Sequence, residues 1–216
     1  MREISSLMKT AVIADIHGNL PGLQLVLGDI AVRGIGNIIC LGDLIEGGQQ
    51  NNEVVELIRS SHIACIRGNH DDIHDSCLNE ENETWLAQLP ETMRIDDVIF
   101  THISPRRKQS AITASVEAWN AFEELPFRLC FIGHLHYPAL FGQVSDHSCD
   151  SRSYDVDAGI FTLNHEDRYI ISCGAIGYPR SGGLYLRYGI YDANAHTVEF
   201  VKLKGPLLPI GQAKPC

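Results

Sequence analysis

The fold of this chain is indicated most clearly by IACIRGNHD, residues 63–71. Its first residues are apolar and β-like, a glycine follows at position 68, and the polar residues Asn69, His70 and Asp71 come next. In open α/β sheets such a turn presents polar side chains at the carboxyl end of a strand, where ligand sites lie. Asn69 offers an oxygen that can coordinate a metal, and His70 offers an imidazole that can exchange a proton. One such turn is weak evidence, but four other stretches of the chain repeat it.

Upstream of this stretch, apolar runs alternate with helical patterns. The runs at 10–14 and 38–41 are short and apolar, which is typical of buried strands. Between them, apolar residues recur at helical spacing after Pro21, and a second helix is predicted over 52–61. This β-α-β-α-β order predicts parallel strands joined by right-handed crossovers.

Downstream, the pattern changes until only strands are predicted. A short helix is expected over 84–89, a strand over 98–100, a helix over 111–124 and a strand over 129–132. After Pro138 no helix is expected, and β-like runs cover 139–144, 154–163, 168–173, 184–192 and 197–203. We therefore expect a second, largely antiparallel sheet packed on the first, within one domain over residues 1–216.

The composition predicts a globular, acidic protein. The chain has 216 residues, of which 44% are hydrophobic, so it can bury a core. The formal net charge of −10 disfavours binding to duplex nucleic acid, because that requires a basic surface. An acidic protein can still act on a phosphate ester when bound metal ions reverse the charge locally.

Location is predicted from the apolar runs and the cysteines. The N-terminus lacks the apolar core of a signal peptide, and no run approaches the ~20 apolar residues of a membrane span. There are seven cysteines and no C-x-x-C pair. Four lie inside apolar runs, namely Cys40, Cys65, Cys130 and Cys173, and three are expected as exposed thiols, namely Cys77, Cys149 and Cys216. This favours a reducing compartment, so we expect a cytoplasmic protein that does not bind membranes.

Five apolar runs of the chain each end in an oxygen or imidazole donor. The donors are Asp15 and His17, Asp43, Asn69 and His70, His102, and His134 and His136. A polar residue that serves only in a turn or a helix cap would explain one such position. It would not explain five stretches in order, each after a strand-like run. In a D-x-H or H-x-H pair, both side chains would share one strand face if the strand continued. One stretch can therefore offer two ligands to a common point.

This set of donors suits two metal ions. Mixed carboxylate, carboxamide and imidazole ligands favour Mn, Fe, Zn or similar metals over a thiolate site. Asp43 has two carboxylate oxygens and can bridge two ions. Two-metal sites clamp both oxygens of an in-line displacement and lower the pKa of bound water towards ~7. Such a pocket is cationic inside an acidic protein, as a phosphate ester requires.

The order D-x-H, G-D, G-N-H-D, an isolated His and G-H-x-H resembles the signature of the calcineurin-like metallophosphoesterases. The matching residues run from Asp15 to His136. Beyond them, GAIGYPR at 174–180 resembles the P-G-S-x-G-x-P-R segment of the small prokaryotic, phosphodiesterase-like branch. The resemblance therefore extends over nearly the whole chain.

The resemblance implies an α/β sandwich of four layers, in which helices flank two mixed β-sheets. It implies two divalent ions, with Mn or Fe favoured over Zn or Ni. One ion would be held by Asp15, His17, Asp43 and His136, and the other by Asp43, Asn69, His102 and His134. It also implies that a metal-bridging hydroxide attacks phosphorus in line while His70 protonates the leaving oxygen. The expected substrate is a small or nucleotide phosphodiester.

The chain departs from the family pattern at two positions. Thr101 precedes His102, where the family usually has Gly. Gly47 stands where protein Ser/Thr phosphatases and symmetrical dinucleoside tetraphosphatases carry an Arg. An arginine guanidinium at this position binds phosphate. Its absence makes substrates of those two enzyme classes less expected.

Three further residues are candidates for substrate binding. Arg106 and Arg180 are candidates to grip the phosphate, with a plain exposed arginine as the alternative. Asn19 is a candidate for substrate contact, with a helix cap as its alternative. Glu46 is interpreted as a solvated loop charge.

Other functions stay open at this stage. The same site would serve a phosphomonoesterase or a dinucleoside polyphosphate hydrolase. A different class is a non-catalytic metal-binding scaffold for protein interaction. The retromer subunit of this fold is such a scaffold and lacks the His of G-N-H, which this chain keeps at His70. The helical H-D phosphohydrolases are disfavoured, because His70 and Asp71 follow a β-like run. The oligomeric state cannot be predicted.

Overall fold

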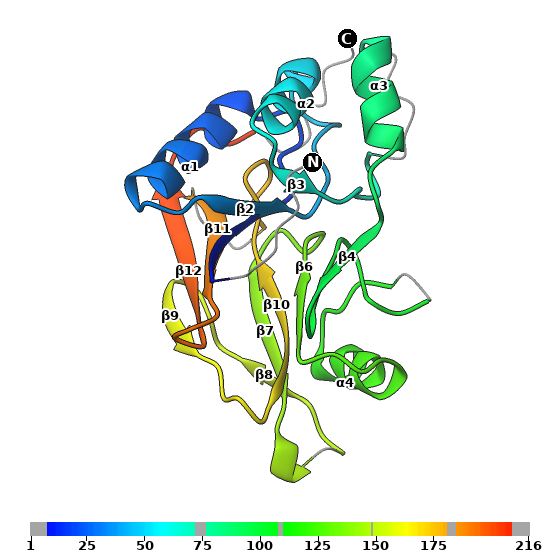
Figure 1. The fold of residues 1–216 in the computed structure, drawn as a ribbon, viewed down its shortest axis with the longest axis vertical. Helices are drawn as coiled ribbons and strands as arrows, with labels where there is room; N and C mark the ends of the chain where they lie inside the picture. The colour runs from blue at the N-terminus through cyan, green and yellow to red at the C-terminus, as the bar shows by residue number, and fades with distance from the viewer. Residues whose placement is uncertain (1–7, 72–76, 108–109, 148, 181–184, 209–216) are drawn as a thin grey trace.

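Two six-stranded sheets form the centre of the computed structural model (Figure 1). The structure describes residues 8–71, 77–107, 110–147, 149–180 and 185–208. In the first sheet the order is β3 (Ala64–Cys65), β2 (Asn37–Cys40), β1 (Lys9–Ile13), β11 (Tyr185–Asp192), β12 (Thr197–Lys204) and β9 (Gly159–Thr162). In the second it is β4 (Thr92–Ile95), β5 (Val98–Thr101), β6 (Leu129–Ile132), β10 (Arg168–Cys173), β7 (Pro138–Gln143) and β8 (Arg152–Tyr154).

Both sheets contain parallel strands, which the β-α-β order predicted for the first sheet only. β1, β2 and β3 are parallel and are joined by α1 (Leu20–Val32) and α2 (Asn51–Ser60). β5, β6 and β10 are also parallel, and α4 (Ser115–Glu124) connects the first two. The carboxyl ends of β1, β2 and β3 therefore face the same way, and so do those of β5 and β6.

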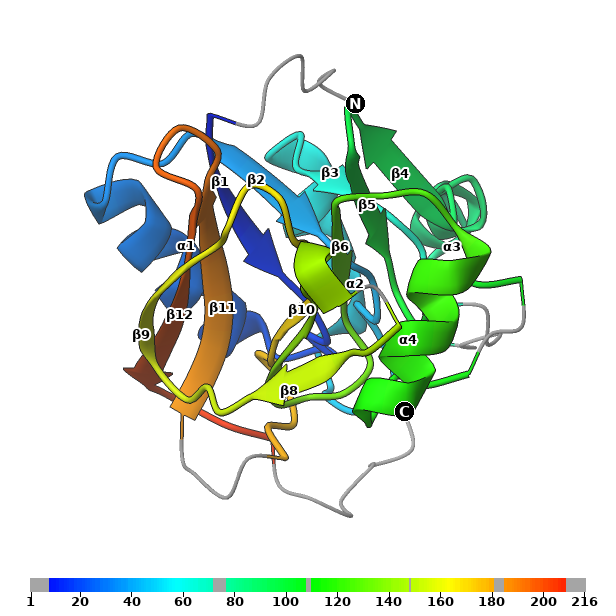
Figure 2. The same ribbon diagram turned by 90° about the horizontal axis from the view of Figure 1, so that it is seen from below.

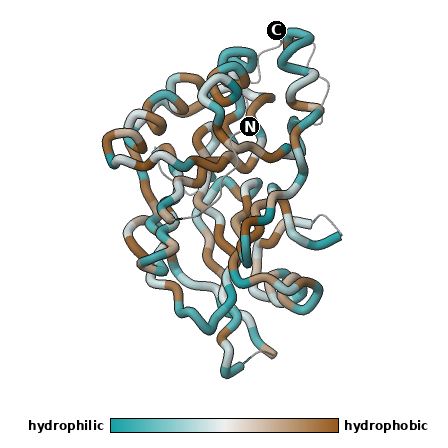
Figure 3. The backbone as a smooth tube through the Cα atoms, viewed as in Figure 1, coloured by the Kyte–Doolittle hydropathy of each residue, from teal (hydrophilic) through white to brown (hydrophobic). Residues whose placement is uncertain are grey.

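Three apolar clusters hold the layers together. One cluster lies between the sheets. It includes Val12 and Leu41 from the side of the first sheet, and Phe100 and Phe131 from the second sheet. A second covers the other face of the first sheet with α1, α2 and α3 (Glu80–Ala87), and a third packs α4 on the second sheet. Figure 2 shows α1 and α4 on opposite sides of the two sheets, and Figure 3 shows hydrophobic residues running through the central strands. The predicted four-layer sandwich is confirmed.

The late strands differ from the expectation of a separate antiparallel sheet. β10, β7 and β8 complete the second sheet beside β6, whereas β11, β12 and β9 extend the first sheet beside β1. The predicted run 154–163 is divided, because β8 ends at Tyr154 in one sheet and β9 begins at Gly159 in the other. Alternation along a strand shows which face is buried but not which strand pairs with it.

Some element bounds also differ from the sequence prediction. The strand β4 was not predicted, since it lies at a sheet edge and no residue in it is fully buried. The helix α3 begins at Glu80 because the Asn79 side chain accepts a hydrogen bond from the Asn82 N–H, which caps the helix. The helix α4 begins at Ser115 rather than 111, and the Glu117 carboxylate accepts from the Ala114 N–H.

The cysteines agree with the expectation in part. Cys40, Cys65, Cys130 and Cys173 are buried and free, and Cys149 is exposed and free. Cys77 is disulfide-bonded and is not the thiol that was expected. Cys216 lies outside the described residues. Among the described residues, no helix has the length and apolar character needed to cross a membrane, and the cytoplasmic location stays a prediction.

Candidate metal centre

The turns after β1, β2, β3, β5 and β6 converge at the carboxyl ends of the parallel strands. The first three strands belong to one sheet and the last two to the other, so the candidate site lies between the sheets at one end. Two groups of side chains there place ligand atoms within 4.8 Å of one another. The groups are Asp15, His17, Asp43 and His136, and Asp43, His102 and His134.

The first group is compact and almost fully buried. The Nε2 atoms of His17 and His136 lie 3.3 Å apart. The distance from His136 Nε2 to Asp15 Oδ1 is also 3.3 Å, and His17 Nε2 lies 3.7 Å from Asp43 Oδ2. Two imidazole nitrogens and two carboxylates directed at one point form a set of donors that binds a divalent cation.

The second group shares Asp43 with the first. His102 Nε2 lies 3.0 Å from Asp43 Oδ2, the same oxygen that faces His17. The predicted ligand Asn69 adjoins this group, since its Oδ1 lies 2.9 Å from His134 Nδ1. All seven predicted metal ligands are therefore brought to one place, and Asp43 stands between the two groups.

Backbone carbonyls orient three of the histidines. The Nδ1 atoms of His17, His102 and His136 contact the carbonyl oxygens of Glu46 (2.8 Å), Leu41 (2.7 Å) and Tyr178 (2.7 Å). An N–H can donate to a carbonyl only from a protonated Nδ1, so each neutral ring keeps its Nε2 lone pair for a ligand. This outer hydrogen bond is typical of histidines that bind metals.

The ligand-bearing turns have a left-handed backbone. The φ angle is 55° at Asp15, 52° at His17, 56° at Asp43, 64° at His134 and 63° at His136. This conformation is uncommon without glycine, and such strain, of order 1–3 kcal/mol per residue, gathers at functional sites. The D-x-H and H-x-H pairs thus do not continue a strand, and their side chains converge through tight turns instead.

The buried atoms of the site fit a metal. Among the described residues, Asp15 Oδ2 is buried without a hydrogen-bond partner, and the buried atoms Asp43 Oδ2 and His102 Nε2 lie 3.0 Å from each other. Buried polar atoms of native proteins almost always have hydrogen-bond partners, and a bound ion is one explanation of an exception. The donors match the cation preferences expected from the sequence, so the residues present fit the predicted group.

The pKa directions in the site follow from burial and charge. Burial lowers the pKa of His17 and of His134, which favours the neutral imidazole that binds metals. Burial alone would raise the pKa of Asp43, but His102 and His17 lower it to about 2. Burial likewise opposes the charge on His102, yet Asp43 and Asp15 raise its pKa to about 9. With no cation bound, a proton on His102 balances the carboxylates, and it competes with a metal.

His70 lies at the edge of the site, and Glu46 is its partner. The ring of His70 meets that of His17 edge-on at a centroid distance of 5.0 Å, and His70 Nε2 lies 4.0 Å from Asp43 Oδ2. His70 Nδ1 contacts the carboxylate of Glu46. Glu46 is exposed, as expected of a loop charge, but its contact with His70 was not expected. Its position three residues after Asp43, in the same turn, was the available signal.

Asp71 connects two ligand-bearing turns. Its carboxylate accepts hydrogen bonds from the N–H groups of Asp43 (2.8 Å), Leu44 (2.8 Å) and Gly68 (2.9 Å). Burial and the neighbouring Asp43 charge raise the pKa of Asp71 to about 6. Sequence reasoning assigned no role to Asp71, which fixes the turn after β2 against the turn after β3.

The three predicted substrate residues lie in different settings. Asn19 caps α1 through the Gly22 N–H, and its amide donates to the carbonyls of Ile176 and Pro206. Arg106 donates to Glu124 of α4. Arg180 is exposed, and its N–H donates to the His136 carbonyl at 2.9 Å, which places it beside a candidate ligand. The capping alternative for Asn19 is thus observed, and substrate contact by the three stays a prediction.

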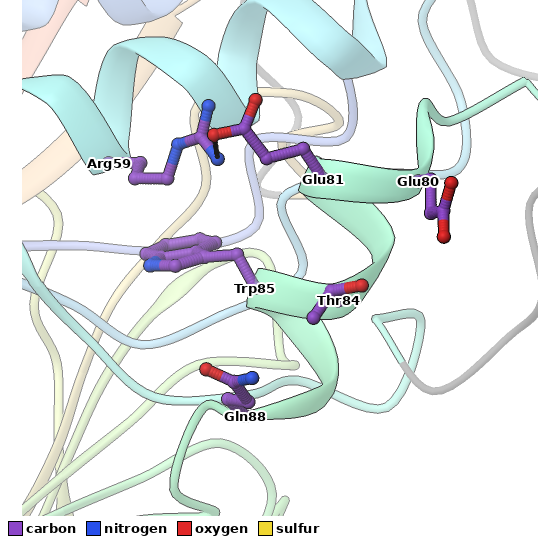
Figure 4. A pocket seen from close by; sticks show the side chains of 6 residues that line it. All are labelled: Arg59, Glu80, Glu81, Thr84, Trp85 and Gln88. Carbon is purple, nitrogen blue, oxygen red and sulfur yellow. Dashed lines mark ion pairs between the residues drawn. The ribbon is translucent and has the colours of Figure 1, made fainter.

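Two hollows differ in their relation to the site. One, of about 150 Å³, lies beside Asn69 and His102 and is also lined by Arg67, Glu91 and Ile103. The other lies on α2 and α3, where the ring of Trp85 lies near the Arg59–Glu81 ion pair (Figure 4). The second hollow contains none of the candidate ligands, so the first is the one next to the metal centre.

Comparisons with known proteins agree with this geometry. An uncharacterised protein of Methanocaldococcus jannaschii is 30% identical, and the match covers 90% of this chain and 86% of that protein. A metallophosphoesterase from Sphaerobacter thermophilus has a similar structure, with a TM-score of 0.80, 28% identity, and coverage of 92% of this chain and 90% of that one. An archaeal phosphodiesterase shares the fold with a TM-score of 0.54 and 14% identity, over 91% of this chain and 100% of that one.

A family model describes most of the chain. The calcineurin-like phosphoesterase superfamily domain matches residues 8–194, which include every candidate metal ligand. The two-sheet fold and the Asp and His cluster agree with that match. The chain therefore belongs to the calcineurin-like phosphoesterase superfamily.

Proposed function

We propose that this protein is a phosphoester hydrolase that uses two divalent cations and prefers phosphodiesters. The observation that carries the proposal is the shared carboxylate of Asp43. Its Oδ2 atom is buried and faces histidines of both ligand groups. A single-ion site does not need a second set of donors around the same carboxylate.

The residues divide between the two cations. Asp15, His17, Asp43 and His136 would hold one, and Asp43, Asn69, His102 and His134 would hold the other. When bound, the cations supply water activation near neutral pH and charge neutralisation for the phosphate. We propose Mn or Fe as the preferred ions, on the mixed oxygen and nitrogen donors.

His70 is proposed as the general acid. Its side chain is one-third exposed, so the ring can meet a substrate at the edge of the buried cluster. Glu46 holds Nδ1, which leaves Nε2 directed toward Asp43 and the metal centre. A proton on Nε2 is then in position to reach the oxygen of a leaving group.

The preference for a small diester is the finer part of the proposal. The hollow beside Asn69 and His102 measures about 150 Å³, which accommodates a small group attached to phosphate. The fold shared with an archaeal phosphodiesterase is consistent with this preference. Arg180 is the proposed phosphate contact outside the cluster, because it is exposed and its backbone N–H donates to the His136 carbonyl.

The test begins with protein stripped of metal by a chelator. Mn, Fe(II), Zn or Ni is restored separately, bound metal is measured by elemental analysis, and turnover is measured on bis-p-nitrophenyl phosphate and p-nitrophenyl phosphate. We expect two equivalents of metal and faster hydrolysis of the diester. Faster hydrolysis of the monoester would favour the phosphomonoesterase. Full metal content without turnover on any phosphoester would favour the non-catalytic scaffold.

A further inference from the structure

The segment after β10 is held against two of the ligand-bearing turns. The N–H of Gly177 donates to the Asp15 carbonyl at 2.7 Å, and the N–H of Arg180 donates to the His136 carbonyl at 2.9 Å. The carbonyl of Tyr178 accepts from His136 Nδ1 at 2.7 Å. The backbone on both sides of Tyr178 is therefore positioned by the metal centre itself.

The ring of Tyr178 is directed over the site rather than into the core. Its centroid lies 5.3 Å from that of His17, at an interplanar angle of 55°. The side chain is partly exposed, and its hydroxyl has no hydrogen-bond partner among the described residues. Because a phenol is protonated near neutral pH, this hydroxyl is a donor without an acceptor at the mouth of the site.

Gly47 provides the space that Tyr178 occupies. A Cβ at position 47 would lie 2.5 Å from the Tyr178 hydroxyl oxygen and would overlap with the ring, and φ is 150° there. The turn after β2 therefore carries a glycine beneath the phenol. The same turn supplies Glu46, the partner of His70, so adjacent residues of one turn contact the phenol and the proposed acid.

We propose that Tyr178 is a substrate-binding residue whose hydroxyl donates a hydrogen bond to a phosphoester oxygen, next to the turn that also holds the partner of His70. The inference rests on the proposed phosphoesterase function. The GAIGYPR segment would then bind substrate in addition to orienting His136. The inference also explains why a glycine stands at position 47, since any side chain there would overlap with the phenol.

The main test is Tyr178→Phe, which removes one oxygen and keeps the ring on His17. A hydrogen bond to a charged oxygen contributes enough binding that its loss raises a dissociation constant about 10- to 100-fold. We expect KM for bis-p-nitrophenyl phosphate and the Kd of inorganic phosphate, measured by calorimetry on Mn-loaded protein, to rise by that factor. We expect kcat to change less than about threefold.

Two further variants sharpen the test. Tyr154→Phe makes the same chemical change on β8, at the edge of the second sheet, and should leave KM and phosphate affinity unchanged. Gly47→Ala places a methyl group where the ring lies and should raise KM and the phosphate Kd in the same direction as Tyr178→Phe. Thermal melting and bound metal should match the wild type in Tyr178→Phe.

The outcomes separate this inference from the proposed function. Unchanged KM and phosphate Kd in Tyr178→Phe would overturn the inference. A loss of kcat with unchanged phosphate affinity would also overturn it, because Tyr178 would then only position His17. If the wild type hydrolyses no phosphoester, the proposed function fails, and the phosphate titration alone decides whether the hydroxyl binds phosphate.

Discussion

At the scale of single residues, neighbours rather than residue type decide what an aspartate does here. Asp43 Oδ2 is buried and faces three histidines. Asp71 accepts three backbone N–H groups and lies behind the same turn. The first carboxylate is arranged for a cation, and the second holds the backbone that carries the first.

The role of His70 is tested by His70→Asn. If His70 donates the proton, kcat should fall about 10²- to 10⁴-fold, because a positioned acid contributes that much. Bound metal should stay at the wild-type level, since His70 is outside both ligand groups. Steady-state kinetics and elemental analysis measure both quantities. His62→Asn, an exposed histidine at the end of α2, is the matched control and should be active. Wild-type turnover in His70→Asn would refute the role.

The role of Glu46 is tested by Glu46→Gln. Since Glu46 contacts His70 Nδ1, the amide should leave the ring less well oriented and lower kcat about 10- to 100-fold. The pH profile of kcat should shift with it, whereas bound metal should not change. Glu166→Gln, in the exposed loop before β10, is the control. If kcat and the pH profile stayed as in the wild type, Glu46 would have no role in positioning His70.

The role of Asp71 is tested by Asp71→Asn. An amide can accept from one side only, so its NH₂ group would face backbone N–H donors and leave buried groups unsatisfied. We expect a loss of about 1–3 kcal/mol in the free energy of unfolding. Urea denaturation measures it, with the exposed Asp146→Asn as control. A change below about 0.5 kcal/mol would contradict the role, since that is the ordinary effect of surface substitutions.

At the scale of elements, the site depends on how closely two turns approach. The turn after β2 meets the turn after β3, and a Cβ on Gly68 would overlap with the Asp43 side chain and backbone. The left-handed residues Asp15 and Asp43 then carry the chain away from the strands. The Asp15 N–H donates to the Gly42 carbonyl and the Asp43 N–H to the Asp71 carboxylate, so contacts with a neighbouring turn support the strain rather than propensity.

The approach of the turns is tested by Gly68→Ala. The added methyl group must displace Asp43, so bound metal should fall by more than half and turnover with it. Elemental analysis after dialysis against Mn measures the loss. Gly28→Ala, on the exposed side of α1, has nothing within 4 Å of its Cβ. It should keep its metal and gain up to about 1 kcal/mol of stability, because alanine favours a helix. Full metal occupancy in Gly68→Ala would show that the turns can separate without cost.

At the scale of the whole molecule, the metal centre joins the two sheets. Asp15, Asp43 and Asn69 follow strands of the first sheet, whereas His102 and His134 follow strands of the second. A bound cation is therefore a cross-link between sheets that otherwise meet through the apolar cluster of Phe100 and Phe131. Cations that bind only the folded chain should stabilise it.

This cross-link predicts a metal-dependent melting temperature. At a free Mn concentration of about 100 Kd, linkage adds about 2.7 kcal/mol, which for a chain of this size corresponds to a rise of about 5–10 °C. Calorimetric scans with and without EDTA measure the rise. Asp15→Asn, which removes the charge of one ligand, should show a smaller rise. Equal melting temperatures with and without metal would contradict the cross-link.

Much of the site was predictable because its residues lie in order along the chain. The ends of β1, β2, β3, β5 and β6 are visible as apolar runs that stop at polar residues. Parallel strands place such ends together, so convergence followed from topology. Glu46 was missed because a charged residue in a turn reads as solvated until its partner is known. Asp71 was missed because its partners are backbone N–H groups, which nearly every residue has and which no residue type therefore indicates.

The sequence by itself determined the superfamily, the β-α-β-α-β order of the first three strands, and the donors of a two-metal site. These depend on residue type and spacing, which a linear pattern contains. Only the tertiary structure decided how the late strands divide between two sheets, that Glu46 pairs with His70, and that Tyr178 lies above Gly47. Each of these depends on contacts between residues far apart in the chain. Such contacts are chosen by packing and hydrogen bonding in three dimensions, so no local pattern specifies them.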